Sequence, residues 1–239
     1  MPATPDASHY DGQDLEALSD LPRYNQWILD HFSAHLRGRV IEVGAGIGNV
    51  SVRYVGQCAS ALLVEPAKNL HEKLVARTSS FPQVETACAL LSEVDPALTA
   101  QPFDAAMMVN VLEHIDDDAA VLRNLFALLS PGGTLLLFVP ALPALYGSLD
   151  ALVHHCRRYT KSSLENVIKN AGFEVDSCRY FDALGMLPWL VAGKVLKQKA
   201  FDARGAKLYD RFGVPVTRAV ERRLAPPLGK SLIAIARKP

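Results

Sequence analysis

Residues 40–51 read VIEVGAGIGNVS, in which an apolar run is followed by three glycines at alternate positions, Gly44, Gly46 and Gly48. Glycine adopts backbone conformations that other residues avoid, and its missing side chain lets a ligand approach the main chain. The dinucleotide fingerprint GxGxxG would need its third glycine at position 49, where Asn49 stands. A P-loop is excluded, because no Gly-Lys-Ser/Thr triplet follows. The stretch therefore predicts a strand, a ligand-binding loop and a helix, and it disfavours a pyrophosphate ligand.

Apolar runs recur along the chain, with helix-length segments between them. Helices are expected over 24–36, 66–79 and 117–129, the last of which begins with acids and ends at SPGG, both typical boundary signals. Alternating strands and helices imply a parallel sheet that is covered on both faces. The expected strands are 39–43, 60–65, 83–88, 104–110, 133–139, 173–181 and 231–237.

Polar side chains follow two of the expected strands. Glu65 ends the strand after the glycine loop, about where a carboxylate can accept both hydroxyls of a ribose. The strand over 104–110 ends in Asn110, and Glu113 and His114 come soon after it. Ligands of an α/β sheet lie at the carboxyl ends of its strands. Dinucleotides and other adenosine-containing ligands both use a ribose-binding acid, so both classes stay open on these residues alone.

These pieces, in this order, resemble the class I S-adenosylmethionine-dependent methyltransferases. The resemblance covers residues 24–182 and rests on the GxGxG loop, on Glu65, and on the segments FDAAMMVNVLEHI, LLSPGG and AGFEV. The segments LYGSLD…HHCRRYT and PPLGKSLIAIARKP resemble a bacterial small-molecule branch of that superfamily. The resemblance implies an α/β fold with a Rossmann-like seven-stranded sheet, an antiparallel last strand and helices on both faces. It implies S-adenosylmethionine as the cofactor.

The resemblance also implies where this cofactor binds. The glycine loop would contact its methionine part, Glu42 would brace the loop, and Asn110 would line the sulfonium pocket. Many relatives carry an acid after the third strand to meet the adenine amino group, whereas this chain reads CALLS over 88–92 and leaves adenine to the backbone there. The expected cofactor-binding residues are Glu42, Gly44, Ala45, Gly46, Gly48, Glu65, Pro66, Ala89, Leu90 and Asn110.

Methyl transfer from a sulfonium is an in-line displacement, to which positioning contributes much of the rate. A hydroxyl acceptor also needs a proton acceptor, whereas a neutral amine mainly needs desolvation and alignment. His114 and His155 are the two candidate bases; alternatively, His114 caps the local turn or contacts only the cofactor. The expected acceptor is small and partly apolar (a natural product, a lipid-like or a sugar-linked molecule), and it is methylated on oxygen or nitrogen.

The candidate acceptor-binding residues are Arg157, Arg158, Tyr159 and Trp189. Either arginine could bind an acidic group of the acceptor. The alternative is that the arginines pair with the acids at 116–118 or with Asp150 and order a lid. No metal site is expected, because three adjacent acids at a helix start cannot all face one ion and their charge already complements the helix dipole.

The expected organisation is a flexible N-terminal segment, residues 1–23, followed by one methyltransferase domain, residues 24–239. Residues 183–228 separate the last two strands, although a hairpin needs only a few residues, and their composition predicts a helical cap over the acceptor or an interface insert. From Lys194 onward the chain holds twelve Lys and Arg against three acids, although the whole chain has 25 of each sign. A homodimer surface and a peripheral membrane contact through this basic region stay open.

The four cysteines are scattered and the longest apolar run is too short to span a bilayer, so a cytoplasmic protein is expected. A nucleic-acid partner is not expected, because the basic region lacks interleaved aromatics and NVLE replaces the amino-methylation motif Asn/Asp-Pro-Pro-Tyr. Two rival functions remain. An NAD(P)-dependent oxidoreductase lacks its fingerprint and a Tyr-x-x-x-Lys pair in this chain. The intact Gly44, Gly46 and Glu65 argue against a non-catalytic cofactor-binding module.

Overall fold

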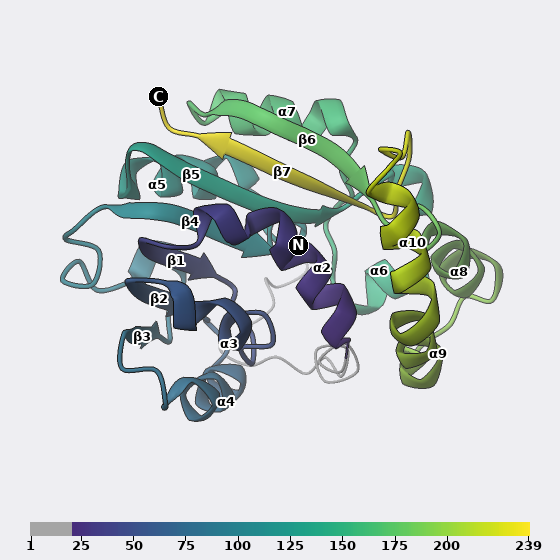
Figure 1. Ribbon diagram of the computed structural model, residues 1–239, viewed down its shortest axis with the longest axis horizontal. Coiled ribbons are helices and arrows are strands. Elements are labelled where there is room, and N and C mark those ends of the chain that lie inside the picture. Colours follow the sequence, from purple (N-terminus) through teal and green to yellow (C-terminus); the bar gives the residue numbers. More distant parts are fainter. Residues whose placement is uncertain (1–20) are drawn as a thin grey trace, which may run out of the picture.

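The computed structural model describes residues 21–239, which form a seven-stranded sheet flanked by helices (Figure 1). The strand order is β3-β2-β1-β4-β5-β7-β6. Neighbouring strands from β1 to β5 pair in parallel, whereas β7 is antiparallel to both β5 and β6. The expected sheet with its antiparallel last strand is therefore confirmed. The strands are β1 (Arg39–Val43), β2 (Ser60–Val64), β3 (Val84–Ala87), β4 (Phe103–Val109), β5 (Leu129–Pro140), β6 (Glu174–Phe181) and β7 (Ser231–Arg237).

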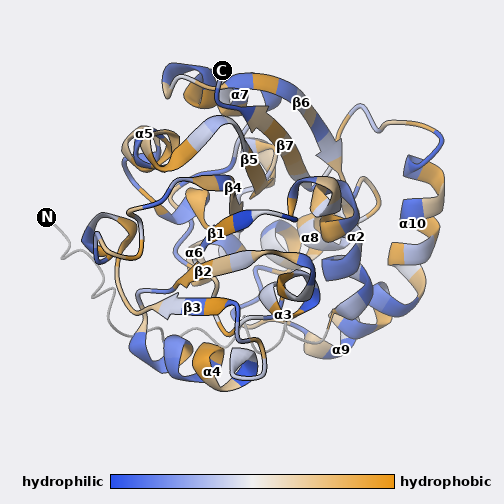
Figure 2. Cartoon of the chain, turned by 60° about the vertical axis from the view of Figure 1, so that its left-hand side comes forward, coloured by the Kyte–Doolittle hydropathy of each residue, from blue (hydrophilic) through white to orange (hydrophobic). Residues whose placement is uncertain are grey.

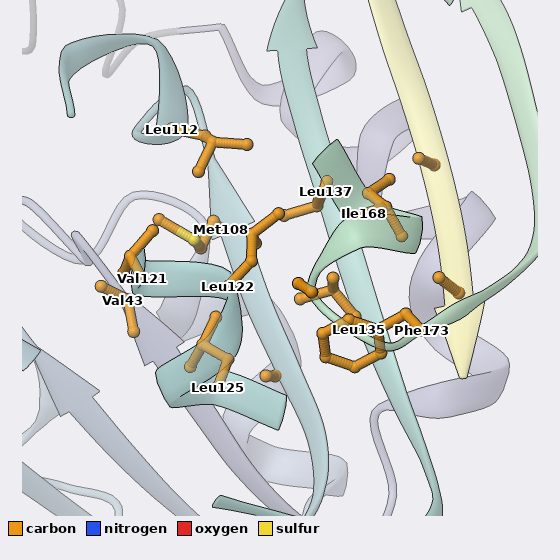
Figure 3. Close-up of a cluster of buried hydrophobic side chains, with 14 of the residues drawn as sticks. Val43, Met108, Leu112, Val121, Leu122, Leu125, Leu135, Leu137, Ile168 and Phe173 are labelled. Atoms are coloured by element: carbon orange, nitrogen blue, oxygen red, sulfur yellow. The ribbon is translucent and has the colours of Figure 1, made fainter. Parts of the chain in front are cut away.

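Helices cover both faces of this sheet, as expected. On one face, Leu122 and Ile168 pack against strand side chains that include Met108 (Figure 3). On the other face, Phe32 lies in a second cluster with Met107. Met107 and Met108 are neighbours on β4 and enter opposite clusters, because successive side chains of a strand alternate between its faces. The sheet thus separates two hydrophobic cores.

The helices begin and end close to the expected residues. Helix α2 starts at Pro22, just before its expected start, and residues 1–20 of the expected flexible segment lie outside the described residues. Helix α5 is capped by Asp117, whose carboxylate accepts a hydrogen bond from the Ala120 N–H at 2.9 Å. The helices before the insert are α2 (Pro22–Phe32), α3 (Ser51–Tyr54), α4 (Lys68–Thr78), α5 (Asp118–Leu128), α6 (Ser148–Leu152) and α7 (Lys161–Asn170).

The segment SPGG, residues 130–133, follows the end of helix α5, as expected, but it also forms part of strand β5. Helix α5 ends at Leu128, and the strand begins at the next residue. Gly132 has a φ of +78° and donates its N–H to the Lys238 carbonyl at 2.8 Å. The Lys238 N–H in turn donates to the Gly133 carbonyl at 2.8 Å. The glycines therefore continue the pairing of β5 toward the end of the chain, far away in sequence.

Residues 183–228 are mainly helical, as their composition predicted, and they lie beyond the carboxyl ends of the parallel strands (Figure 1). Asp210 attaches this insert to α2, because its carboxylate accepts the N–H groups of Tyr24 at 2.8 Å and Arg23 at 3.3 Å. The insert is therefore packed onto the domain. Its elements are α8 (Met186–Leu190), α9 (Ala203–Leu208) and α10 (Val214–Glu221), with π-helical turns at Val191–Val195 and Tyr209–Gly213.

The insert exposes many large apolar side chains. Leu187, Val195 and Leu224 are 67%, 68% and 72% exposed. Helix α10 carries hydrophobic and hydrophilic residues together (Figure 2). Within residues 21–239, none of the helices combines the length and the apolar character that crossing a bilayer demands. Exposed apolar side chains gathered on one segment are typical of a contact surface.

Candidate active site

The glycine loop joins β1 to α3 at the carboxyl edge of the sheet. Gly44, Gly46 and Gly48 all have positive φ, at 72°, 56° and 80°, a region that favours glycine. A Cβ on Gly44 would lie only 2.3 Å from Val111 Cγ2. The N–H groups of Gly44 and Ala45 both donate to the carbonyl of Val64, at 2.8 and 3.1 Å. The loop is thus held against the end of β2 in a conformation that side chains would disturb.

Glu65 follows β2 and is buried, with 5% exposure. Its Oε2 accepts the N–H of Gly46 at 2.8 Å, and its Oε1 accepts the N–H of Ala67 at 3.0 Å. Burial raises the pKa of this carboxyl, and the two backbone hydrogen bonds oppose that effect. A carboxylate offers about four lone-pair sites. Two sites therefore remain for ribose hydroxyls, and the glycine loop and the acid fit an adenosine-containing cofactor.

Glu42 lies on β1, beneath the loop. Its Oε2 accepts hydrogen bonds from Ser51 Oγ at 2.6 Å and from Tyr54 Oη at 2.9 Å. Burial raises the pKa of Glu42 to about 7. Both partners belong to α3, so Glu42 ties the helix that follows the glycine loop to the strand that precedes it.

The remaining expected cofactor residues also lie at the carboxyl ends of strands. Asn110 follows β4, has a φ of 53° and donates its N–H to the Phe138 carbonyl at 2.8 Å. Pro66 is half-buried after Glu65, Ala89 is half-buried after β3, and Leu90 beside it is exposed. The fold therefore gathers these residues at one edge of the sheet, and their contact with a cofactor stays a prediction.

A second group of candidate side chains follows β4, the strand that ends at this edge. Glu113 and His114 occupy the 3-10 turn after β4, and His155 follows α6. The Cys156 N–H donates to the Glu113 carbonyl at 2.8 Å and so holds the two segments together. The His114 and His155 rings lie 4.8 Å apart in an edge-to-face arrangement, and His155 Nε2 lies 3.7 Å from Glu113 Oε1. Both histidines proposed from the sequence therefore meet at one place.

Asp150 orients this group, a role that the sequence did not indicate. Its Oδ1 accepts hydrogen bonds from His155 Nδ1 at 2.8 Å and from Arg158 Nε at 2.7 Å. Burial acts against ionisation of Asp150, but the bond from His155 and the charge of Arg158 outweigh it and lower the pKa of the carboxyl. An ionised Asp150 accepts the Nδ1 proton of His155, so that in a neutral ring Nε2 would carry the free lone pair.

Glu113 is fully buried, and its burial raises the pKa to about 8. Desolvation, followed by the nearby His155, lowers the pKa of His114 to about 4, so the His114 ring is neutral at pH 7. One donor atom from each of Glu113, His114 and His155 lies within 4.8 Å of the others, a spacing compatible with holding a metal ion. The sequence placed Glu113 in a polar stretch but gave it no role, because its burial depends on tertiary packing.

The candidate acceptor-binding arginines have internal partners. Arg157 Nη1 bonds to Asp118 Oδ2 at 2.9 Å, and Tyr159 Oη donates to the same oxygen at 2.7 Å. Arg158 is buried against Asp150, and its guanidinium carbon lies 4.9 Å above the Trp189 ring. These pairings match the alternative in which the arginines order a lid. Whether they also bind an acceptor stays a prediction. Trp189 belongs to the insert and connects it to the Asp150 and His155 group.

Comparison with known proteins agrees with this geometry. A family described as a methyltransferase domain matches residues 16–178. The chain is 32% identical to the ubiquinone biosynthesis O-methyltransferase of Xanthomonas axonopodis pv. citri (strain 306) over 181 residues, which covers 67% of this chain and 73% of that protein.

Two solved structures share the fold. The N-methyltransferase NodS from Bradyrhizobium japonicum WM9, in complex with S-adenosyl-L-homocysteine, superposes with a TM-score of 0.62 at 13% identity, covering 98% of this chain and 95% of that chain. Phosphoethanolamine N-methyltransferase 2 from Haemonchus contortus, in complex with S-adenosyl-L-methionine, gives a TM-score of 0.60 at 17% identity, covering 90% of this chain and 52% of that chain.

The sheet order and the glycine loop after β1 define a Rossmann-like enzyme that binds an adenosine-containing cofactor. With the family match over 16–178, the chain belongs to the class I S-adenosylmethionine-dependent methyltransferases. It is an enzyme, and S-adenosylmethionine is its cofactor. The oxidoreductase and the non-catalytic module are thereby set aside as alternatives.

Proposed function

We propose that this enzyme transfers the methyl group of S-adenosylmethionine to a hydroxyl oxygen of a small, partly apolar acceptor. The observation that carries the proposal is the ordered group of Glu113, His155 and Asp150 beside the end of β4. A hydroxyl must be activated before it attacks, whereas a neutral amine needs only desolvation and alignment. Because this group of ionisable side chains could take up the proton of a hydroxyl, it supports an oxygen acceptor. The name of the Xanthomonas relative, an O-methyltransferase, supports it as well.

The cofactor side of the reaction is assigned to the glycine loop and Glu65. When bound, the sulfonium supplies an activated methyl group. Gly44, Gly46 and Gly48 leave the loop backbone open to the methionine part, and Glu65 offers oxygens to the ribose hydroxyls. Asn110 at the end of β4 lies between this loop and the Glu113 turn along the chain, and we assign it to the sulfonium pocket. Holding the methyl group and the acceptor in line is the main contribution of these residues.

The insert, residues 183–228, is assigned as the cap over the acceptor. Its Trp189 packs on Arg158, and Ser148 Oγ donates to the Gly193 carbonyl at 3.1 Å. Lys194 Nζ donates to the Ala144 carbonyl at 2.7 Å. These contacts join the insert to α6 and to the loop that carries His155, so an acceptor that reaches His155 meets apolar side chains of the insert. A cap also keeps water from separating the acceptor from the methyl group.

Paired acceptors test the oxygen assignment. Alkylphenols and alkylanilines with the same alkyl chain are incubated with the enzyme and S-adenosylmethionine, and release of S-adenosylhomocysteine is measured. We expect turnover of the phenols, increasing with the length of the alkyl chain; methylation of the anilines alone would refute the oxygen assignment.

His155→Ala tests the catalytic group. It should lower kcat about 10²–10⁴-fold without changing the affinity for S-adenosylhomocysteine. His71→Ala, on helix α4, is the matched control.

Trp189→Ala tests the cap. The substitution removes the ring that packs on Arg158 but touches none of the residues assigned to the cofactor. The KM for the acceptor should rise at least about tenfold, since burying a large side chain is worth about 1.5–3 kcal/mol, while the calorimetric affinity for S-adenosylhomocysteine should stay within twofold. An unchanged acceptor KM would contradict the cap.

We also propose that the insert contacts an anionic lipid surface. Apolar side chains with basic residues among them are typical of segments that lie in a membrane interface. The insert is basic, because residues 183–228 hold nine Lys and Arg against three acids. The large side chains of this region that are exposed are Leu184, Leu187, Val191, Val195, Leu196, Leu208, Phe212, Val216, Val220, Leu224 and Leu228.

Vesicle sedimentation tests the lipid contact. The full-length protein should bind vesicles that contain phosphatidylglycerol, bind phosphatidylcholine vesicles weakly, and dissociate as salt rises. Leu224→Glu should weaken binding, because it adds an acid to the exposed apolar surface. If the protein forms a dimer in analytical ultracentrifugation and binds neither kind of vesicle, the surface is instead a contact with a second copy of this chain.

We further propose a cytoplasmic location, supported by the four free cysteine thiols.

A further inference from the structure

We propose that Glu113, His114 and His155 form a binding site for a divalent transition-metal ion. One carboxylate oxygen and two imidazole nitrogens lie within 4.8 Å of one another. Zinc lies about 2.0–2.2 Å from such ligand atoms, which places tetrahedral neighbours roughly 3.4 Å apart. His155 Nε2 and Glu113 Oε1 are already 3.7 Å apart, so small side-chain rotations complete the site.

The carboxylate of Glu113 is the strongest evidence for an ion. The side chain has 0% exposure, and within residues 21–239 neither of its oxygens has a hydrogen-bond partner on another residue. Buried polar groups are normally satisfied, and an unpartnered buried carboxylate is costly. The nearest cationic candidate, His155 Nε2, is beyond hydrogen-bond distance at 3.7 Å. A bound cation would supply the partner that this carboxylate lacks.

Asp150 provides the support that a metal-binding histidine usually has. Its Oδ1 lies 2.8 Å from His155 Nδ1, which fixes the ring and leaves Nε2 on the side of Glu113. Arg158, buried behind Asp150, holds the same oxygen at 2.7 Å. A carboxylate behind a ligating imidazole fixes the tautomer and makes the other nitrogen a better ligand. The arrangement therefore contains both the ligands and their outer support.

The donor set selects the class of ion. Two imidazoles with one carboxylate suit Zn²⁺, Fe²⁺ or Mn²⁺, whereas Mg²⁺ and Ca²⁺ prefer oxygen ligands. Three protein ligands leave a coordination position for an oxygen of another molecule. An ion there would polarise a bound hydroxyl and lower its pKa. Metal binding stands on the geometry alone; the activation of an acceptor hydroxyl rests on the proposed function.

The test uses the full-length protein after chelator treatment and measures binding of Zn²⁺ by calorimetry and of Co²⁺ by its visible absorption. We expect a single high-affinity ion per chain. Glu113→Gln and His155→Ala should each remove it, and Asp150→Asn should weaken it about 10–100-fold. His71→Ala and Glu72→Gln, neighbours on helix α4, are the matched controls and should bind as the parent does. Circular dichroism checks that every variant is folded.

The outcomes separate this inference from the proposed function. Equal binding by the parent and by folded Glu113→Gln and His155→Ala would overturn the site, as would a folded parent that binds no ion. Should the variants fail to fold, the Co²⁺ spectrum of the parent decides, because only an ordered low-coordinate nitrogen and oxygen site gives intense visible bands. Metal binding without turnover of any hydroxyl acceptor would refute the proposed function and leave the site standing. Turnover by a metal-free enzyme would leave the proposed function standing and remove the ion from it.

Discussion

Glu42→Gln should stabilise the protein at neutral pH. Glu42 has 3% exposure on β1 and accepts hydrogen bonds from Ser51 and Tyr54 through Oε2. Burial raises its pKa from 4.5 to about 7, and the charge of Glu65 adds to this effect. Glutamine keeps an acceptor oxygen for both hydroxyls but cannot ionise. The substitution therefore removes the cost of burying a negative charge and keeps the packing.

The magnitude follows from the pKa. A change from 4.5 to about 7 corresponds to about 3 kcal/mol, at about 1.4 kcal/mol for each pKa unit. The folded state holds the Glu42 proton more tightly than the unfolded state does, so the stabilisation is present below pH 4.5 and is lost as the pH rises through 7. At pH 8 the glutamine variant should exceed the parent in free energy of unfolding by up to about 3 kcal/mol. At pH 4 the two proteins should be equally stable.

Urea unfolding followed by circular dichroism at a series of pH values measures this difference. Other buried acids titrate in both proteins, and subtracting the two profiles isolates Glu42. Glu72→Gln, at an exposed position of α4, is the matched control for the loss of one carboxyl group. A difference that stays constant between pH 4.5 and pH 8 would refute the assignment of a raised pKa to Glu42.

Three further substitutions test other parts of the structure. Glu65→Ala should weaken S-adenosylhomocysteine binding by about 1–3 kcal/mol, as for a lost charge-assisted acceptor, and unchanged calorimetric affinity would exclude Glu65 from the ribose. Gly46→Val places a side chain at a φ of 56° in the glycine loop and should abolish cofactor binding while the circular dichroism stays native; normal binding would make the loop merely structural. Asp210→Ala removes the acceptor for the N–H groups of Tyr24 and Arg23 and should lower the free energy of unfolding by about 1–2 kcal/mol. The exposed cap Asp202, which serves only α9, is its control, and equal losses from Asp202→Ala would contradict an anchoring role for Asp210.

The sequence predicted all seven strands of the sheet, but it missed the first four residues of β5, which begins at Leu129 and not at the expected residue 133. The strand expected over 39–43 is β1, and the one expected over 231–237 is β7. Apolar periodicity, glycines and proline are local signals, and they act on the same few residues that form each element. The ligand loop was predictable for the same reason, because the glycines at positions 44, 46 and 48 permit the positive φ values that the loop adopts. The antiparallel last strand, in contrast, was expected only through the resemblance to a known family.

Tertiary structure alone decided how distant segments meet. Glu113 and His155 are far apart in sequence, and their loops are joined by tertiary contacts such as the hydrogen bond from the Cys156 N–H to the Glu113 carbonyl and that from Arg157 to Asp118. Asp150 gained its role from the two side chains that share its oxygen, and Gly132 entered β5 by pairing with Lys238. The periodicity of apolar residues predicts which face of a helix or strand is buried, but it does not predict which side chains of other elements that face will contact. The burial that raises the pKa of Glu113 is a property of the folded chain, because desolvation depends on every segment packed around a group.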